Sequence, residues 1–173
     1  MVAVAAVVGC SSGNNAVGVS LVSTGAASTW NGTWVDSTAG TSGTLGLALA
    51  VNAATSVATG TLTFGGNSTS FFGGPPPAPT PLSGTFNPQS WIVNQTGTPY
   101  GDVSVTWGQS YYVGKITGSV TNISNPAIQR VDFTGLANSG NITLSLALTL
   151  AQTTGTPPVH VIQYGSATLN KAS

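Results

Sequence analysis

Charge is the scarcest property of this 173-residue chain. Only 3% of its residues are charged, three basic and three acidic, and glutamate is absent. A net charge of zero with so few cations provides no basic patch to neutralise phosphates, which argues against nucleic acid as a partner. Little charge repulsion separates one copy of the chain from the next, so we expect the chain to associate with copies of itself.

Catalytic and metal-binding side chains are equally rare. Histidine occurs once, as His160, and the three acidic residues, Asp36, Asp102 and Asp132, lie far apart in the sequence. Acid–base catalysis needs paired groups, a metal site needs several ligands, and no G-x-S-x-G nucleophile motif is present. The sequence therefore predicts no catalytic residue, no metal and no cofactor. We expect His160 to be structural, Asp132 to pair with Arg130 at the surface, and the other two aspartates to be turn residues.

Cysteine occurs once, as Cys10, which excludes an intramolecular disulfide. Long hydrophobic runs are also missing: the apolar run 2–8 is too short to span a bilayer, so no transmembrane segment is expected. Cys10 is either a small buried hydrophobic residue or a modified one. The surrounding sequence V-V-G-C-S-S resembles the lipobox of bacterial lipoproteins, although no lysine or arginine precedes it. That resemblance implies that Cys10 is lipidated and that the residues after it form a tether.

What the chain does contain is alternating hydrophobicity. The clearest stretch is 141–152, N-I-T-L-S-L-A-L-T-L-A-Q, in which apolar residues occupy every second position. A strand places all of them on one face, whereas a helix would scatter them around its circumference. A second stretch, 44–51, has the same period. Their core-facing residues are Leu45, Leu47, Leu49, Val51, Ile142, Leu144, Leu146, Leu148 and Leu150.

Short strands bounded by Gly, Pro and Asn account for most of the remaining chain. No helical pattern is present, and the spacing predicts an all-β fold: a single antiparallel β-sandwich or β-barrel of about nine to eleven strands, in meander or Greek-key order. Residues 25–173 form this domain, and 44–51 and 56–64 form a hairpin. In the strand 111–122 we expect a bulge at Gly114. The other expected strands are 30–36, 82–86, 90–94, 102–107, 129–136 and 159–170.

One long loop, 65–81, is rich in glycine and proline. Its prolines lack the amide donor that a central strand needs, and loops of this length in compact domains are usually functional or mobile. Phe71 and Phe72 lie at its tip. Two alternatives follow: the two rings fold back over an open end of the barrel, or they are contacts for a neighbouring subunit or partner.

Residues 1–24 form an N-terminal extension ahead of the domain, with β-branched runs at 2–8 and 16–22. The low charge and the Asn, Ser, Thr and Ala content resemble subunits of prokaryotic surface filaments and coats. In some such filaments an N-terminal strand is donated to the sheet of the next subunit, and the resemblance implies the same use of these runs. The candidate donor residues are Val2, Val4, Val8, Val17, Val19 and Leu21.

Asparagine followed by any residue and then Ser or Thr occurs five times. Such triplets are acceptors for N-linked sugar in exported proteins, so glycans are a further candidate partner. The loop position and the position before a turn are the best placed for modification. The glycosylation candidates are Asn31, Asn67, Asn94, Asn122 and Asn141.

Two functions fit these observations. The first is a non-enzymatic extracellular or cell-surface structural protein, a self-assembling subunit of a filament or coat held together by β-strand addition. The alternative follows from the strands G-T-W-V, G-T-L-T-F-G-G, S-G-T-F and I-T-G-S-V-T-N, which look like those of small secreted barrels, including lipocalin-like bacterial lipoproteins. In that case a lipid-anchored barrel holds a small apolar ligand in an interior lined by Leu45, Leu47, Leu49, Leu144, Leu146 and Leu148.

Overall fold

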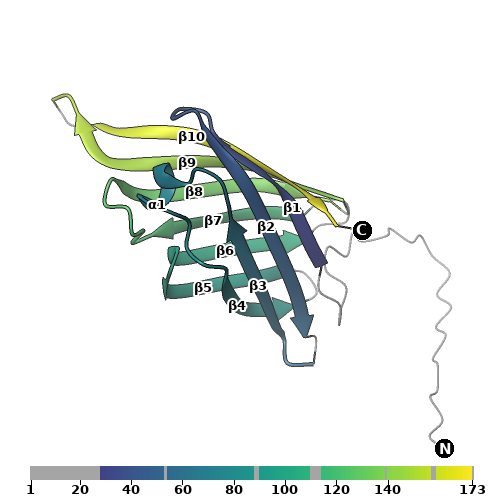
Figure 1. Ribbon diagram of the computed structural model, residues 1–173. Coiled ribbons are helices and arrows are strands. Elements are labelled where there is room, and N and C mark those ends of the chain that lie inside the picture. The colour runs from purple at the N-terminus through teal and green to yellow at the C-terminus, as the bar shows by residue number, and fades with distance from the viewer. Residues whose placement is uncertain are drawn as a thin grey trace, which may run out of the picture.

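A computed structural model of the chain describes residues 28–52, 54–87, 90–109, 114–138, 140–156 and 159–172. Ten antiparallel strands close into one barrel in which every strand pairs with its neighbours in the sequence and β1 pairs with β10 (Figure 1). The prediction of an all-β antiparallel fold is therefore confirmed, and of the alternatives left open the described chain forms a barrel in meander order. The N-terminal extension, with its donor candidates and Cys10, lies outside the described residues.

The strands match the expected ones, with ends that differ by a few residues. Few residues separate consecutive strands except between β3 and β4, where the only helical turn of the described chain, α1, is found. The elements are β1 (Ser28–Asp36), β2 (Thr41–Asn52), β3 (Val57–Phe64), α1 (Thr69–Phe72), β4 (Thr80–Asn87), β5 (Ser90–Thr98), β6 (Gly101–Gln109), β7 (Gly114–Thr121), β8 (Ile128–Ala137), β9 (Asn141–Thr154) and β10 (Val159–Lys171).

Alternation along each strand separates the inside of the barrel from the outside. In β9, Ile142 and Leu148 are 1% and 0% exposed, whereas the intervening Thr143 and Ser145 are exposed. Trp30 and Trp34, four residues apart on β1, are likewise buried on the inner face. Burying one apolar face of every strand is the main source of stability that the sequence offers.

Closure of the barrel depends on the pairing of the first strand with the last. Seven consecutive residue pairs join β1 to β10, from Trp30↔Lys171 to Asp36↔Gly165. Beyond Asp36 the β9–β10 hairpin continues past the rim as a projecting ribbon (Figure 1). Along the barrel wall itself, each described strand has a neighbour on both sides.

Turn geometry is set by Asn and Asp side chains. Asp36 Oδ1 accepts hydrogen bonds from the backbone amides of Thr38 and Ala39, at 3.0 and 2.9 Å. Asn52 and Asn138 cap the turns after β2 and β8 in the same way. These short polar side chains replace a backbone acceptor in tight turns, which explains much of the asparagine content of the chain.

The wall is weakest between β4 and β5. Only three residue pairs join these strands, Thr85↔Ile92 to Asn87↔Ser90, although β4 pairs with β3 over six. Nearer the start of β4, the Gln95 side chain accepts a hydrogen bond from the Ser83 amide at 3.0 Å. Side chains therefore connect β4 and β5 where the backbone hydrogen bonds between them stop. We refer to this contact between the two strands as the β4–β5 seam.

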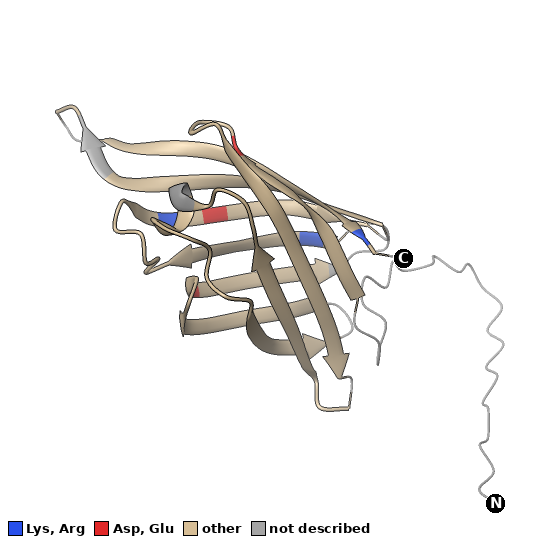
Figure 2. Cartoon of the chain, viewed as in Figure 1, with Lys and Arg blue, Asp and Glu red and all other residues tan. Residues whose placement is uncertain are grey.

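Two local expectations need correction. Thr80 and Pro81 belong to β4 and not to the loop, because a proline is tolerated on a strand whose other side lacks a ladder partner. Gly114 is not a bulge: it opens β7 in regular register with Gln109 and Ala137. Charged residues are scattered over the described strands and turns and form no single patch (Figure 2).

Candidate functional site

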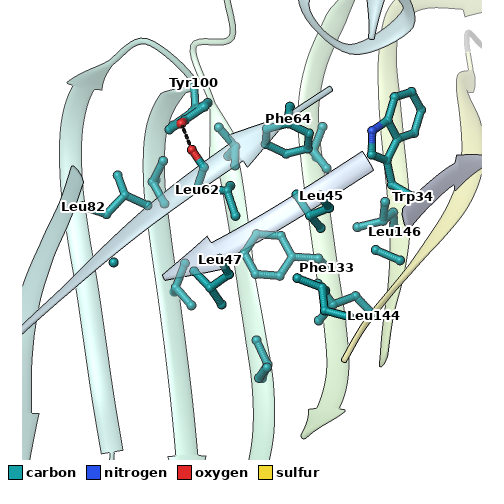
Figure 3. Close-up of a pocket in the computed structure, with 18 of the residues that line it drawn as sticks. Trp34, Leu45, Leu47, Leu62, Phe64, Leu82, Tyr100, Phe133, Leu144 and Leu146 are labelled. Atoms are coloured by element: carbon teal, nitrogen blue, oxygen red, sulfur yellow. Dashed lines mark hydrogen bonds between the residues drawn. The ribbon is translucent and has the colours of Figure 1, made fainter. Parts of the chain in front are cut away.

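The barrel encloses an apolar cavity of about 180 Å³. Its long walls are aliphatic: Leu45 and Leu47 of β2 face Leu144 and Leu146 of β9 across the interior (Figure 3). Phe133 of β8 lies between them. Small barrels of about eight strands are nearly filled by their own side chains, and a ten-stranded barrel is wider, which accounts for the remaining space.

The segment between β3 and β4, residues 65–79, closes one end of this cavity, and we refer to it as the lid. Phe71 is 7% exposed and packs edge-on against Trp34, with ring centroids 4.9 Å apart. Phe72 makes a similar contact with Phe64 at 5.3 Å. Both lid phenylalanines line the cavity, so within the single chain they fold back over the end of the barrel, which was the first of the two alternatives.

Backbone hydrogen bonds anchor the first part of the lid to β2. Gly65 and Thr44 exchange two of them, at 2.9 and 3.1 Å, and the Trp34 indole N–H donates to Gly65 O at 3.2 Å. Gly66 and Gly73 have positive φ values of 88° and 71°, a conformation that glycine adopts without strain. The lid thus contains a short helical turn, α1, that is flanked by two glycines with positive φ.

Tyr100, in the turn between β5 and β6, completes this end of the cavity. Its hydroxyl donates to Leu62 O on β3 (Figure 3) and accepts from the Thr80 amide of β4 at 3.2 Å. Burial raises the pKa of the Tyr100 phenol, an effect that outweighs the opposite influence of its hydrogen bond with Thr80. Tyr100 therefore acts as a neutral hydrogen-bonded brace between β3, β4 and the β5–β6 turn.

Two tryptophans form the opposite end of the cavity. Trp91 of β5 and Trp107 of β6 are directly paired across the strands, with ring centroids 6.3 Å apart. The Cη2 atom of Trp91 reaches to within 3.0 Å of the position that a Cβ would take on Gly60 of β3, so the ring extends across the interior over this glycine. A second void, too small for an organic ligand, lies beyond the two indoles and is bounded partly by Leu49 and Phe86.

The chemistry of the lining restricts what the cavity can hold. Among the described residues, the lining contains no charged side chain, and the Tyr100 hydroxyl is already hydrogen-bonded. An ionised ligand would lose its hydration without compensation, at a cost of several kcal/mol or more. An engineered apolar cavity of about 150 Å³ stays dry and binds benzene, whereas drug-sized ligands need about 300 Å³ or more. The cavity therefore suits a small neutral molecule of roughly one or two rings.

Four of the six leucines that were predicted to line the interior line the cavity, and two do not. Leu45, Leu47, Leu144 and Leu146 line the cavity. Leu49 and Leu148 are buried at 2% and 0% exposure but pack elsewhere in the core.

The titratable residues are not brought together. Among the described residues, no group of three His, Cys, Asp or Glu side chains is close enough to hold a metal ion. His160 is exposed and its Nδ1 lies 3.2 Å from Leu150 O. Arg130 and Asp132 form the predicted surface pair at 2.7 Å. Asp102 accepts hydrogen bonds from the Gly97 amide and the Asn122 side chain, which lower the pKa of its carboxyl.

The glycosylation candidates all lie on the outside of the barrel or in loops. Asn31, Asn67 and Asn94 are exposed. Asn122 is exposed too, with a positive φ of 51°. Asn141 is half-buried, and its amide nitrogen donates to Leu169 O and Asn170 Oδ1, so it is the least accessible of the five.

Sequence reasoning missed most of the aromatic residues that line the cavity outside the lid. Trp34, Trp91, Trp107 and Tyr100 all line it, together with Phe133. For Trp34 and Trp107 the shared strand face was visible in the alternation, but nothing local indicated that rings from distant strands meet. Tyr100 lies in a turn, where alternation gives no signal.

No helix in the described part of the chain has both the length and the apolar character needed to cross a membrane. Comparison with protein-family models, curated proteins and solved structures finds no match for the chain.

Proposed function

We propose that this protein is a non-enzymatic binding barrel that holds a small, neutral, apolar molecule in its interior, outside the cell or at its surface. The observation that carries the proposal is the cavity of about 180 Å³ in the barrel interior, whose lining offers hydrocarbon surface and no charge. A core designed only for stability is packed to crystal-like density with few voids larger than water. An empty cavity lowers stability, because its lining side chains lack van der Waals contacts that a bound ligand would supply.

Self-assembly by strand addition is the second candidate. Closure of the wall counts against it, because a donated strand needs a free edge and barrels remove their edges. One observation favours association: the projecting part of β10 lacks a β1 partner before Gly165, and its Val159, Ile162 and Tyr164 are 63%, 44% and 60% exposed. Assembly would then involve this ribbon and not the barrel wall.

A ligand pair tests the binding proposal. Indane and indane-1-carboxylate have the same hydrocarbon rings and differ by one charged group. We expect indane to bind the full chain in isothermal titration, and the carboxylate to bind roughly a hundredfold or more weakly, because the cavity cannot solvate its charge.

A variant that fills the cavity with a larger side chain tests the same proposal. Ala167 of β10 is 3% exposed and lines the cavity, so Ala167→Phe should abolish indane binding while thermal unfolding remains cooperative. The control is Ala48→Phe on the outer face of β2, where Ala48 pairs with Thr29 and Thr61 and does not line the interior cavity. It should bind indane like the parent. Failure of indane to bind the parent, or equal binding by both ligands, contradicts the proposal.

A further inference from the structure

The outer face of the barrel carries an open groove that crosses β6, β7, β8, β9 and the start of the projecting part of β10. Its volume is about 520 Å³, within the range of about 300–1,000 Å³ that is typical of ligand sites. We refer to it as the outer groove. Its outward-facing residues form two neighbouring rows across the strands: Tyr164, Ala147, Asp132, Ser119 and Ser104 in the first, with Arg130 beside them, and Ser145, Thr134, Thr117 and Thr106 in the second.

The surface of the outer groove is polar but has no net charge. Thr117, Thr134 and Ser145 are exposed, and each of their hydroxyls can both donate and accept a hydrogen bond. Arg130 Nε donates to both carboxylate oxygens of Asp132, at 2.7 and 2.9 Å. The two side chains of this pair are 49% and 45% exposed, so a ligand in the groove can reach both.

One aromatic ring completes the outer groove. Tyr164 is 60% exposed, and its neighbour across the strands is the small side chain of Ala147. An exposed aromatic ring beside polar groups is typical of binding surfaces, because the ring offers an apolar face and the polar groups fix the orientation of the ligand. The groove therefore combines one apolar ring with hydroxyls and a neutralised ion pair.

This combination excludes several classes of ligand. An ionised ligand finds no unpaired charge, because Asp132 already neutralises Arg130. An apolar ligand would remove water from the hydroxyls and the ion pair without replacing the hydrogen bonds that they lose. A peptide strand cannot be added at β6, β7 or β8, since each of them is already paired on both sides.

We propose that the outer groove binds a neutral oligosaccharide. The hydroxyls of a sugar both donate and accept, so they match the Ser and Thr side chains and form charge-assisted hydrogen bonds with Asp132 and Arg130. The C–H face of a sugar ring is apolar and packs on the ring of Tyr164. A second groove of about 420 Å³ shares Thr134 and Ser145 with the first, which provides room for further sugar units along the outer face. This inference goes beyond the proposed function and does not depend on it.

Four tetrasaccharides test the inference on the full chain: the neutral cellotetraose, maltotetraose and β-1,4-mannotetraose, and the acidic tetragalacturonate. We expect at least one neutral sugar to bind with a Kd of about 1 mM or below. In ¹⁵N-labelled protein it should shift the backbone amide signals of Asp132 and Ala147 and leave that of Ala48, on the outer face of β2, unchanged. Tetragalacturonate should bind no more tightly than the neutral sugars, because the groove has no net charge.

Variants of the outer groove locate the site. Tyr164→Ala should weaken the bound sugar about fivefold or more, whereas Tyr164→Phe, which keeps the ring, should bind it like the parent. Asp132→Asn should also weaken it about fivefold, since its charge-assisted hydrogen bonds are lost. The controls are Val159→Ala and Asp102→Asn, because neither residue lines the groove. Cooperative thermal unfolding of each variant checks that it is folded.

The outcomes separate this inference from the proposed function. If none of the three neutral sugars binds, or if tetragalacturonate binds more tightly than all of them, the inference is wrong. Sugar binding that survives both Tyr164→Ala and Asp132→Asn, or that Val159→Ala weakens equally, overturns it as well, because the site then lies elsewhere or depends on the projecting ribbon as a whole. Binding of indane in the interior should be the same in the parent and in Tyr164→Ala, and its success or failure leaves the test of the outer groove unaffected.

Discussion

Tyr100 shows how a single polar side chain seals an apolar interior. It is 4% exposed, and its hydroxyl joins the end of β3 to the start of β4 at the place where β4 no longer pairs with β5. The brace requires the neutral phenol, because a phenolate cannot donate to Leu62 O. Among the described residues that line the cavity, it is the only one with an ionisable group.

Replacing Tyr100 by phenylalanine should lower the free energy of unfolding at pH 7 by about 1–3 kcal/mol, since the Leu62 carbonyl and the Thr80 amide both lose a partner. The measurement is urea denaturation. Tyr164→Phe, at a side chain that is 60% exposed, is the control and should change stability by less than about 0.5 kcal/mol.

Alkaline pH should act through the same residue. The folded pKa of Tyr100 lies above the ordinary value of 10.0, so its stabilising contribution is complete below that pH and is lost as the pH rises through the raised pKa. We expect absorbance at 295 nm to show one tyrosine ionising late, together with a loss of stability that Tyr100→Phe does not share. A Tyr100 phenol that ionises with a pKa at or below 10.0 would contradict this.

At the scale of elements, the lid and the β4–β5 seam belong together. The lid leads directly into β4, whose first residues are held to β5 and its following turn by the Gln95 and Tyr100 side chains. Side-chain bridges of this kind open at lower cost than a backbone ladder, because fewer hydrogen bonds break together. For the binding function proposed above, we therefore expect a ligand to reach the cavity at the seam and the lid, where opening disturbs the barrel least.

Truncating Phe71 to alanine tests the role of the lid. We expect ligand dissociation and exchange of the Trp34 indole hydrogen to become at least about tenfold faster, because the Trp34–Phe71 contact that keeps the lid closed is lost. Amide exchange at Leu148, which is fully buried in β9, should stay unchanged. Stopped-flow displacement and hydrogen-exchange NMR provide the two rates.

Phe86→Ala is the control for this experiment. Phe86 lies at the other end of the barrel beside the small second void, so its loss should leave the Trp34 indole protected. Equal acceleration by both variants would mean that ligand exchange follows general loosening of the barrel and not lid opening.

The whole molecule is held together by closure. Each described strand has two neighbours drawn from residues 28–172, so the barrel is complete without the N-terminal extension. Its first and last strands meet along seven residue pairs, which makes folding depend on contacts between the two ends of the domain. Stability, and with it the proposed ligand binding, should thus depend on the barrel, whereas strand donation is predicted for residues 1–24.

Deleting residues 1–24 separates these two functions. We expect the shortened chain to unfold cooperatively at the same denaturant concentration, within about 0.5 kcal/mol, and to bind indane as the full chain does. If the extension donates a strand, sedimentation velocity and electron microscopy should show assemblies of the full chain that the shortened chain does not form. Loss of folding on deletion would contradict the completeness of the barrel.

The sequence by itself determined the class of fold, the position of nearly every strand and, for β2 and β9, which face is buried. It did so because successive side chains of a strand point to opposite faces, and in β2 and β9 apolar residues occupy every second position without interruption. Asp36, Asp102 and the Arg130–Asp132 pair were also predictable, since turns and neighbours on one strand are local.

The tertiary structure decided the closure, the cavity and the Trp91–Trp107 pair. The distance between β1 and β10 in the sequence gives no local sign that the two pair, and whether ten strands form a sandwich or a barrel depends on how the sheet twists and closes. Space in the interior is the difference between the volume that the barrel encloses and the volume of all the inward side chains. The size of the cavity cannot be predicted from any single stretch of the sequence, because side chains from many strands together determine it.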